Sequence, residues 1–310
     1  MEWKCVETID GETIKFSLRP VPPFRLDLTA WALRRRLHNA VDHWEGDTYW
    51  RVLVIRNQAV RVAVQQRGTM LEVTVTGAGL RASTQAEVSA ALERLLGFRT
   101  DLRRFYKVAA GETRLNRLAQ RFMGLKPPRF PTLFEALVNG ISCQQLSLTV
   151  GITVMNRLGA HCWLAFHADA HAFPRPEDLA RADLTELRAL GYSRQKGRAL
   201  TEVSQAIADG RLDLEPIESL EDEPAMERLL QLRGVGRWTA EYALLRGLGR
   251  THVFPGDDVG ARQNLRRWLH LRRPLNYQGV DQVLSRWRPF GGLIYFHLLL
   301  DRLDEAGHLA

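Results

Sequence analysis

Residues Leu229–Gly249 read LLQLRGVGRWTAEYALLRGLG, and this stretch decides the fold. A helical pattern that ends near Leu232 meets Arg233-Gly234-Val235-Gly236-Arg237, and a second helical pattern begins at once. Two glycines separated by one apolar residue permit a tight turn through backbone conformations that other residues avoid. Such a turn leaves the first amides of the next helix unpaired and pointing outward, where they can bind an anion. We expect Val235 to fill the space between the two helices.

A DNA phosphate suits such an anion site, and binding through backbone amides would not depend on the DNA sequence. Glycine turns also join helices in ordinary αα-hairpins, so the two glycines alone do not establish DNA binding. The segment that follows favours the DNA interpretation. Val253–Arg262, VFPGDDVGAR, is an apolar stretch that enters a Pro-Gly turn and then a helix opened by two acids.

The composition is that of a globular protein with a basic surface. The chain has 310 residues, enough for about two domains, and a formal net charge of +8, which favours an anionic partner without identifying it. Cys5, Cys143 and Cys162 have no paired spacing, and an iron–sulfur cluster would need four thiolates. We find neither an apolar run of membrane-spanning length nor a signal-peptide pattern. We therefore expect a cytoplasmic, nucleoid-associated protein without a membrane partner.

One short stretch gathers potential metal ligands, namely His161, Cys162, His167 and His171. His167 and His171 have helical spacing, but the H-E-x-x-H pattern of catalytic zinc sites is absent. A helix end and loop with exposed histidines is the favoured interpretation, and a zinc site is the alternative.

The first hundred residues predict a small antiparallel α+β domain. Alternating or β-branched runs predict strands at Thr13–Leu18, Tyr49–Ile55, Val60–Gln65 and Met70–Val75. Helical patterns cover Leu28–Leu37, with Asp27 as the expected N-cap, and Gln85–Leu96, which Gly97 should end.

The rest of the chain reads as helical almost throughout, without strand signals of similar strength. The expected helices are Glu112–Met123, Leu133–Leu158, Asp183–Ala189, Ser193–Asp209, Pro224–Leu232, Trp238–Gly247, Val259–Leu269 and Val280–Leu303. The predicted fold class is therefore α+β, an antiparallel sheet domain followed by an all-α region. The predicted boundaries are 1–100 for the first domain and 101–310 for the helical region, with subdomains at about 128–250 and at about 101–127 plus 251–310.

The hairpin, followed along the chain by the V-F-P-G-D-D loop, resembles the corresponding segments of the helix-hairpin-helix DNA glycosylase superfamily. Within it, the chain is most similar to the bacterial 3-methyladenine DNA glycosylase II (AlkA) group. The resemblance extends to Pro22–Phe24, Gly140–Ser147, Leu190–Leu200 and Trp287–His297, and so covers essentially the whole chain. It implies a monomeric base-excision repair enzyme that acts on double-stranded DNA with a damaged base. It implies no cofactor apart from a monovalent cation in the hairpin.

The resemblance assigns the catalytic carboxylate to Asp258, the second acid of the pair. Asp257 is then expected to be a helix N-cap or an acid that complements the helix dipole, and a capping acid is also the alternative role for Asp258. A carboxylate near C1′ stabilises the oxocarbenium-like transition state and can orient water. Relatives that also cut the strand carry a Schiff-base lysine at the position of Trp238, so the resemblance implies a glycosylase without lyase activity.

The resemblance also implies a base pocket. Trp238 and Tyr242 lie four residues apart, on one helix face, and would stack on an electron-poor alkylated base that has left the duplex. Aromatic residues at this spacing can instead belong to a helical core. A family tryptophan aligns with Leu299, and either Tyr295 or Trp31 could take its place.

The wedge that fills the gap left by the base should come from Cys143–Leu146. Family relatives have leucine where this chain has Gln145, so Gln145 or Leu146 is the candidate, with Gln144 beside them; a structural role for the two glutamines is the alternative. The phosphate contacts that we expect are Gly234, Gly236, Arg237, Thr239 and Arg262. The expected cation ligands are the carbonyls of Leu230, Leu232 and Val235.

Three other functions are alternatives. An 8-oxoguanine-directed glycosylase of the same superfamily would be favoured by a lysine at position 238. A non-catalytic helix-hairpin-helix DNA-binding protein would not need Asp258. A metabolic enzyme of unrelated fold would have only the weak His161–His171 cluster as a site.

Overall fold

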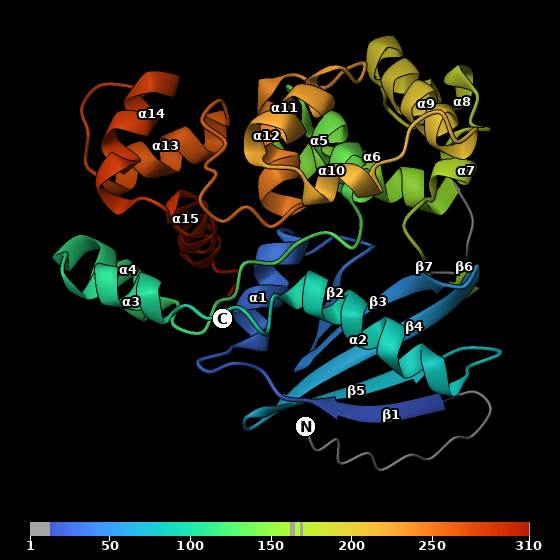
Figure 1. Cartoon of the computed structure of the whole chain (residues 1–310), viewed down its shortest axis with the longest axis horizontal. Coiled ribbons are helices and arrows are strands. Elements are labelled where there is room, and N and C mark those ends of the chain that lie inside the picture. Colours follow the sequence, from blue (N-terminus) through green and yellow to red (C-terminus); the bar gives the residue numbers. More distant parts are fainter. Residues whose placement is uncertain (1–12, 162–164, 168–169, 310) are drawn as a thin grey trace.

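The computed structural model describes residues 13–161, 165–167 and 170–309. An antiparallel sheet formed by the N-terminal part of the chain is followed by a helical region, which confirms the predicted α+β class. Figure 1 shows the sheet below the layer that contains the hairpin helices, with α2 lying across the sheet and α13, α14 and α15 grouped at one side.

The sheet has five strands in the order β1-β5-β4-β3-β2, and all neighbours are antiparallel. Its strands are β1 (Thr13–Leu18), β2 (His43–Glu45), β3 (Thr48–Ile55), β4 (Gln58–Arg67) and β5 (Met70–Thr76). Four of them were predicted from their alternation. The short edge strand β2 was not, because three residues carry too little periodic signal.

The helices before the hairpin are α1 (Leu26–Arg34), α2 (Ala82–Leu96), α3 (Arg103–Ala110), α4 (Thr113–Arg121), α5 (Leu133–Cys143), α6 (Leu148–His161), α7 (Pro176–Leu179), α8 (Leu184–Ala189), α9 (Arg194–Ala208) and α10 (Glu215–Ser219). The hairpin and the helices after it are α11 (Asp222–Leu230), α12 (Arg237–Arg246), α13 (Val259–Trp268), α14 (Tyr277–Leu284), the 3-10 turn η1 (Ser285–Trp287) and α15 (Gly291–Glu305).

Three expected helices differ from the structure at places that shape the site. The helix expected at Leu28–Leu37 ends at Arg34, because Arg35 adopts a left-handed conformation with φ of 62°. The N-cap is Arg25 and not Asp27, which lies inside the first turn. The helix expected at Leu133–Leu158 is broken after Cys143, and the one at Val280–Leu303 is broken before Gly291.

Two large apolar clusters hold the molecule together. One joins the inner face of the sheet to α2 and to the helices around the hairpin, including Leu137 and Val235. The other surrounds α15 and joins it to α3, α4 and α13. A buried ion cluster links sheet and helices as well: the Arg51 guanidinium of β3 contacts the Asp42 carboxylate at 3.1 Å and the Glu135 carboxylate of α5 at 3.0 Å.

The histidine-rich stretch differs from the expected loop. Short strands β6 (Ala165–His167) and β7 (Ala170–His171) pair with each other, and neighbouring residues pack on the outer face of β3 around Trp50. Cys162 lies outside the described residues. The His161 ring is 3.5 Å from a Glu186 carboxylate oxygen, and the described residues contain no cluster of three ligands suited to a metal.

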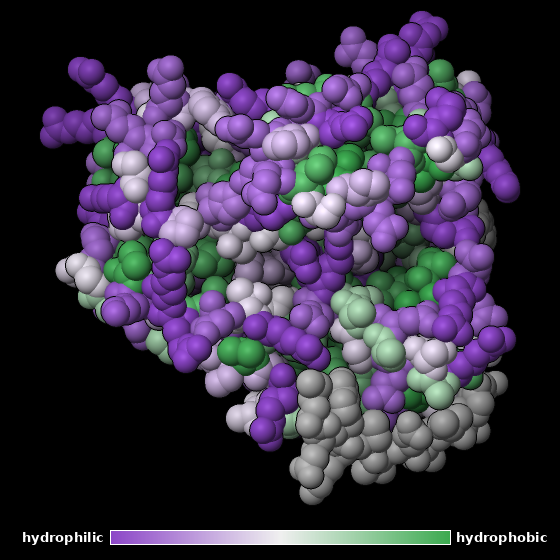
Figure 2. Space-filling view, in the orientation of Figure 1, coloured by the Kyte–Doolittle hydropathy of each residue, from purple (hydrophilic) through white to green (hydrophobic). Residues whose placement is uncertain are grey.

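Hydrophilic side chains cover most of the face in Figure 2, and hydrophobic residues show mainly in the hollows between elements. Among the described residues, no helix is both long and apolar enough to span a membrane.

Candidate active site

The hairpin connects the end of α11 to the start of α12, and its two glycines serve different purposes. Gly234 has φ of 77°, and a Cβ there would lie 2.5 Å from the Cβ of Ala199. Gly236 has an extended backbone with φ of −95°, and a Cβ there would meet nothing within 4 Å. Only Gly234 is therefore required by conformation, contrary to the expectation for both. Val235 is buried in the apolar cluster, as predicted.

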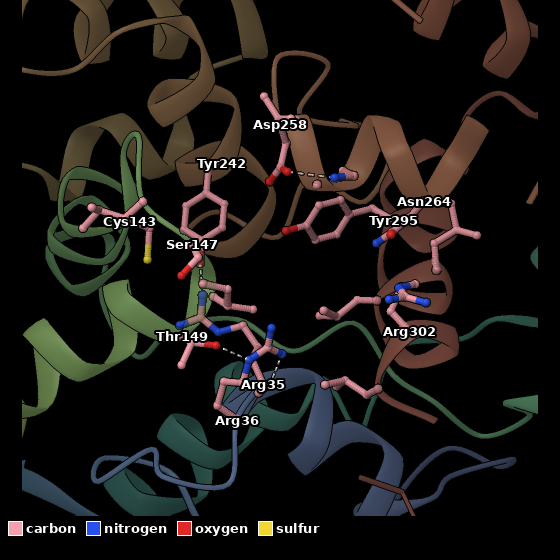
Figure 3. A pocket seen from close by; sticks show the side chains of 18 of the residues that line it. Arg35, Arg36, Cys143, Ser147, Thr149, Tyr242, Asp258, Asn264, Tyr295 and Arg302 are labelled. Carbon is pink, nitrogen blue, oxygen red and sulfur yellow. Dashed lines mark hydrogen bonds between the residues drawn. The ribbon is translucent and has the colours of Figure 1, made fainter. Parts of the chain in front are cut away.

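The acid pair opens α13. Asp258 is the N-cap residue, and its Oδ1 accepts a hydrogen bond of 2.8 Å from the Ala261 amide. The prediction that Asp257 caps this helix is therefore wrong. The Asp257 carboxylate instead accepts a hydrogen bond of 2.7 Å from Nε of Arg237, at the start of α12. The first acid thus ties the loop to the hairpin, and the second faces the cavity (Figure 3).

Burial raises the pKa of Asp258 above its usual range. The amides of Ala261 and Gly260 oppose this shift, because they stabilise the carboxylate. The Trp238 indole N–H also lowers the pKa of Asp258. The indole N–H makes no hydrogen bond of normal geometry to any described residue. The result is a carboxylate with little water around it, whose charge a developing cation could neutralise.

The loop that carries Asp258 is anchored by Glu241, a buried residue of α12. One carboxylate oxygen accepts a hydrogen bond of 3.0 Å from the Gly256 amide, and the other accepts one of 2.7 Å from the Tyr277 hydroxyl. Burial raises the pKa of Glu241, and the hydrogen bond to Glu241 raises the pKa of Tyr277 to about 12. The Arg237 guanidinium lies 4.0 Å from the centre of the Tyr277 ring. Sequence reasoning missed this anchor.

A cavity of about 960 Å³ lies in front of Asp258, within the size range of small-molecule sites. Figure 3 shows Tyr242 and Tyr295 below Asp258, on either side of the cavity. The predicted pocket residues that line it are Trp238, Tyr242, Tyr295 and Leu299. The Trp238 and Tyr242 rings stack on each other, with centres 5.5 Å apart and planes 29° apart.

Trp31 is not part of the cavity wall. It is buried in the cluster around α15, where its ring stacks on His308 at 6.0 Å between centres. His308 itself lines the cavity, so Trp31 lies one layer behind it. Of the two candidates for the missing tryptophan, only Tyr295 reaches the cavity.

Two buried arginines that sequence reasoning missed support Tyr242. The Arg35 guanidinium donates to the Tyr242 hydroxyl at 2.9 Å and to Oδ1 of Asn139 at 2.8 Å. This hydrogen bond fixes the position of the Tyr242 hydroxyl. Arg246, buried behind the ring, lies 5.9 Å from its centre and 5.0 Å from the centre of Phe130. Arg35 belonged to a predicted helix interior, which carries no signal for such a contact.

The candidate wedge residues lie in the turn between α5 and α6, residues 144–147, which we call the wedge turn. Gln144 is held in place, because its Nε2 donates to the Gly234 carbonyl at 2.7 Å and to Oγ1 of Thr239 at 2.8 Å. Gln145 is exposed and left-handed, with φ of 54°, and the Leu146 side chain is exposed beside it. Gln144 therefore has the structural role that is the alternative for both glutamines, and the turn presents Gln145 and Leu146 to solvent.

The predicted phosphate contacts lie close to the hairpin but differ in access. Gly234 and Gly236 are exposed, whereas Thr239 is buried. Arg237 is exposed but already paired with Asp257. Arg262 lies half-buried on α13. Among the predicted cation ligands, the Leu232 carbonyl accepts a hydrogen bond of 3.1 Å from the Val235 amide.

Comparisons with known proteins agree with the family resemblance that the hairpin and the acid pair indicate in the sequence. Residues 138–289 match the model of the HhH-GPD superfamily base excision DNA repair proteins. The chain belongs to this helix-hairpin-helix superfamily and resembles its AlkA-type members.

Two curated bacterial relatives carry glycosylase names. The putative DNA-3-methyladenine glycosylase YfjP of Bacillus subtilis is 27% identical over 92% of this chain and 97% of its own length. DNA-3-methyladenine glycosylase 2 of Escherichia coli is 28% identical over 59% of this chain and 63% of its own. Among solved structures, the 3-methyladenine DNA-glycosylase from Archaeoglobus fulgidus aligns over 94% of this chain and 98% of its own, with 24% identity and a TM-score of 0.81, and shares the fold.

Proposed function

We propose that the protein is a monofunctional DNA glycosylase that excises alkylated purines of the 3-methyladenine type from duplex DNA. The observation that carries the proposal is the position of Asp258, a desolvated carboxylate on the wall of a cavity that also exposes Trp238 and Tyr242. The names of the Bacillus and Escherichia relatives support the same substrate class.

The reaction breaks the bond between C1′ and the base nitrogen, and the bonding electron pair leaves with the base. Positive charge develops on the sugar, and the Asp258 carboxylate stabilises it. Water then adds to C1′ and gives up a proton to the carboxylate or to solvent. An alkylated purine already carries positive charge and is a good leaving group, so a second acid is not required.

The aromatic pair and the hairpin supply binding rather than chemistry. Trp238 and Tyr242 would stack on the extrahelical base. The exposed amides at Gly234 and Gly236 would bind a phosphate at the start of α12. The carbonyls of Leu230, Leu232 and Val235 are oxygen donors suited to a monovalent cation between hairpin and phosphate, because the hydrogen bond on Leu232 leaves a second lone pair free.

The absence of lyase activity is part of the proposal. Trp238 cannot form an imine, and none of the described residues that line the cavity is a lysine. The Lys196 amine, near the wedge turn, donates to the carbonyls of Ser142 at 3.0 Å and Gln144 at 2.6 Å. It therefore stabilises that turn instead of facing the cavity.

The test is a panel of duplexes that carry a 3-methyladenine-type lesion, 1-methyladenine, hypoxanthine or 8-oxoguanine. We expect free alkylated base to be released, with strand breakage only after alkali. Release of 8-oxoguanine alone, or strand cleavage without alkali, would contradict the proposal.

A further inference from the structure

The loop between α1 and β2 forms one side of the cavity mouth. Arg35, Arg36, Leu37 and His38 all line the cavity. The Leu37 side chain is 62% exposed, the highest value among the large apolar residues exposed in the described part of the chain. The family resemblance assigns no role to this loop.

Exposed apolar residues gather around this cavity. Of the six large apolar side chains exposed among the described residues, three line it, namely Leu37, Leu146 at 39% exposure and Val259 at 59%. A single exposed leucine would need no explanation, but several around one opening indicate a contact surface.

The backbone on both sides of Leu37 is fixed. The Arg34 guanidinium donates to the Leu37 carbonyl at 2.6 Å, and Nδ2 of Asn39 donates to the Arg34 carbonyl at 2.8 Å. Nε of Arg36 donates to Oγ1 of Thr149 on α6 at 3.1 Å. The leucine is therefore held outward by a rigid loop, so a partner that covers it would not have to order the loop first.

Charge indicates the kind of partner. Leu37 lies between Arg36 and His38, on a chain with a net charge of +8, and these residues suit a polyanion with apolar surfaces inside it. Figure 3 shows Arg36 on the side of the cavity away from Asp258, with Ser147 of the wedge turn on a neighbouring side. A duplex seated over the opening would thus meet apolar side chains from two separate loops.

We propose that Leu37 is a second DNA-inserting side chain, which packs against the base stack next to the gap left by the extrahelical nucleotide. This inference rests on the proposed glycosylase function. Unstacked base faces are apolar, and inserted leucines cover such faces in other DNA-bending proteins. The wedge turn fills the gap from one side and the α1–β2 loop from the other, which gives the N-terminal α+β region a direct part in recognising damage.

The experiment compares Leu37→Ala with wild type on two duplexes of one sequence, one intact and one with a tetrahydrofuran abasic-site analogue. Affinity is measured by fluorescence anisotropy at one salt concentration. We expect the variant to bind the abasic duplex about tenfold more weakly, because a leucine is no longer removed from water, and to bind the intact duplex within about twofold of wild type. Val108→Ala, an apolar residue 37% exposed on α3 and away from the cavity, is the matched control and should match wild type on both.

A second readout places 2-aminopurine opposite the analogue, where wild type should increase its fluorescence by unstacking and Leu37→Ala should do so less. Equal abasic-duplex affinity for the variant and wild type would overturn the inference. A wild-type dimer that Leu37→Ala dissociates, seen by sedimentation, would also overturn it, because Leu37 would then contact a second copy. The abasic analogue has no base to release, so this result is separate from the base-release assay that tests the proposed function.

Discussion

Glu241 and Gly256 are joined by a hydrogen bond of 3.0 Å from the Gly256 amide to Oε2 of Glu241. Gly256 lies two residues before Asp258, and Glu241 lies on the helix that the hairpin turn leads into. The position of the proposed catalytic carboxylate is thereby fixed relative to the element that would bind the phosphate.

Replacing Glu241 should therefore slow base release without preventing DNA binding. The Gly256 amide and the Tyr277 hydroxyl donate to different oxygens of Glu241, and Glu241→Gln replaces one of these oxygens by an NH2 group, so one hydrogen bond is lost. A lost bond to a charged group is worth about 1.5–3 kcal/mol. We expect a single-turnover rate constant at least about tenfold lower, with affinity for the abasic duplex unchanged. Tyr277→Phe removes one donor and leaves the Gly256 bond, so it should have the smaller effect. A wild-type rate for Glu241→Gln would show that the anchor does not position Asp258.

The two hairpin glycines should respond differently to alanine. Gly234→Ala places a side chain at positive φ and 2.5 Å from Ala199, so we expect a loss of about 1–3 kcal/mol in the free energy of unfolding. Gly236→Ala has an ordinary φ and open space, and its stability should equal that of wild type. Urea denaturation measures both.

Position 236 also tests the phosphate contact. Gly236→Asp should weaken binding to every DNA sequence alike, because a carboxylate would repel the phosphate. Gly236→Ala is the uncharged control. A loss that depends on DNA sequence would argue against contact through the phosphate.

Much of this arrangement follows from local sequence. The strand alternation, the helix periodicity and the Gly234 turn all depend on residues close together in the chain, and the sequence predicts them well. The order of the hairpin, the Pro-Gly turn and the acid pair carries the family resemblance, through which Asp258 is proposed as the catalytic acid. Helix ends at the site are less predictable, because the left-handed Arg35 ends α1 a turn earlier than the apolar pattern indicates.

The contacts that complete the site could not be predicted, because they join distant segments. Arg35 and Tyr242 are 207 positions apart, and neither residue carries a local signal for their hydrogen bond. The N-cap role expected for Asp257 belongs to Asp258 instead. The pattern places a cap somewhere in Asp257-Asp258, but only the geometry shows that Asp258 both caps α13 and faces the cavity.

The buried ion cluster between sheet and helices should contribute strongly to stability. Arg51→Met leaves the carboxylates of Asp42 and Glu135 buried without their partner, so we expect a loss of about 3–5 kcal/mol in the free energy of unfolding at pH 7. The loss should be smaller at pH 5, because burial raises the pKa of Glu135 to about 7 and the Glu135 carboxylate of the folded variant can bind a proton there. Arg67→Met is the control, since its ion pair with Asp47 is exposed and should contribute about 0–1 kcal/mol. Equal effects of the two variants would contradict this account.

The buried Asp258 carboxylate should reduce the stability of the folded protein near pH 7. Burial raises its pKa in the folded state, so the folded protein binds this proton more tightly than the unfolded chain does. The associated stability is present at low pH and is lost as the pH rises through the folded pKa. Asp258→Asn keeps the N-cap acceptor and removes the charge, and should raise the melting temperature by about 2–4 °C at pH 7 and by less near pH 4. Asp257→Asn, which only loses its ion pair to Arg237, should not raise it.

We infer that the Asp258 carboxylate performs the chemistry and that the hairpin and the aromatic pair perform the binding. The most direct test is the single-turnover rate of base release from methylated duplex DNA by Asp258→Asn, measured beside its affinity for an abasic-analogue duplex. We expect a rate below about 1% of wild type, which is a loss of about 2.7 kcal/mol in transition-state stabilisation, with affinity within about threefold of wild type. Base release by Asp258→Asn at the wild-type rate would contradict it.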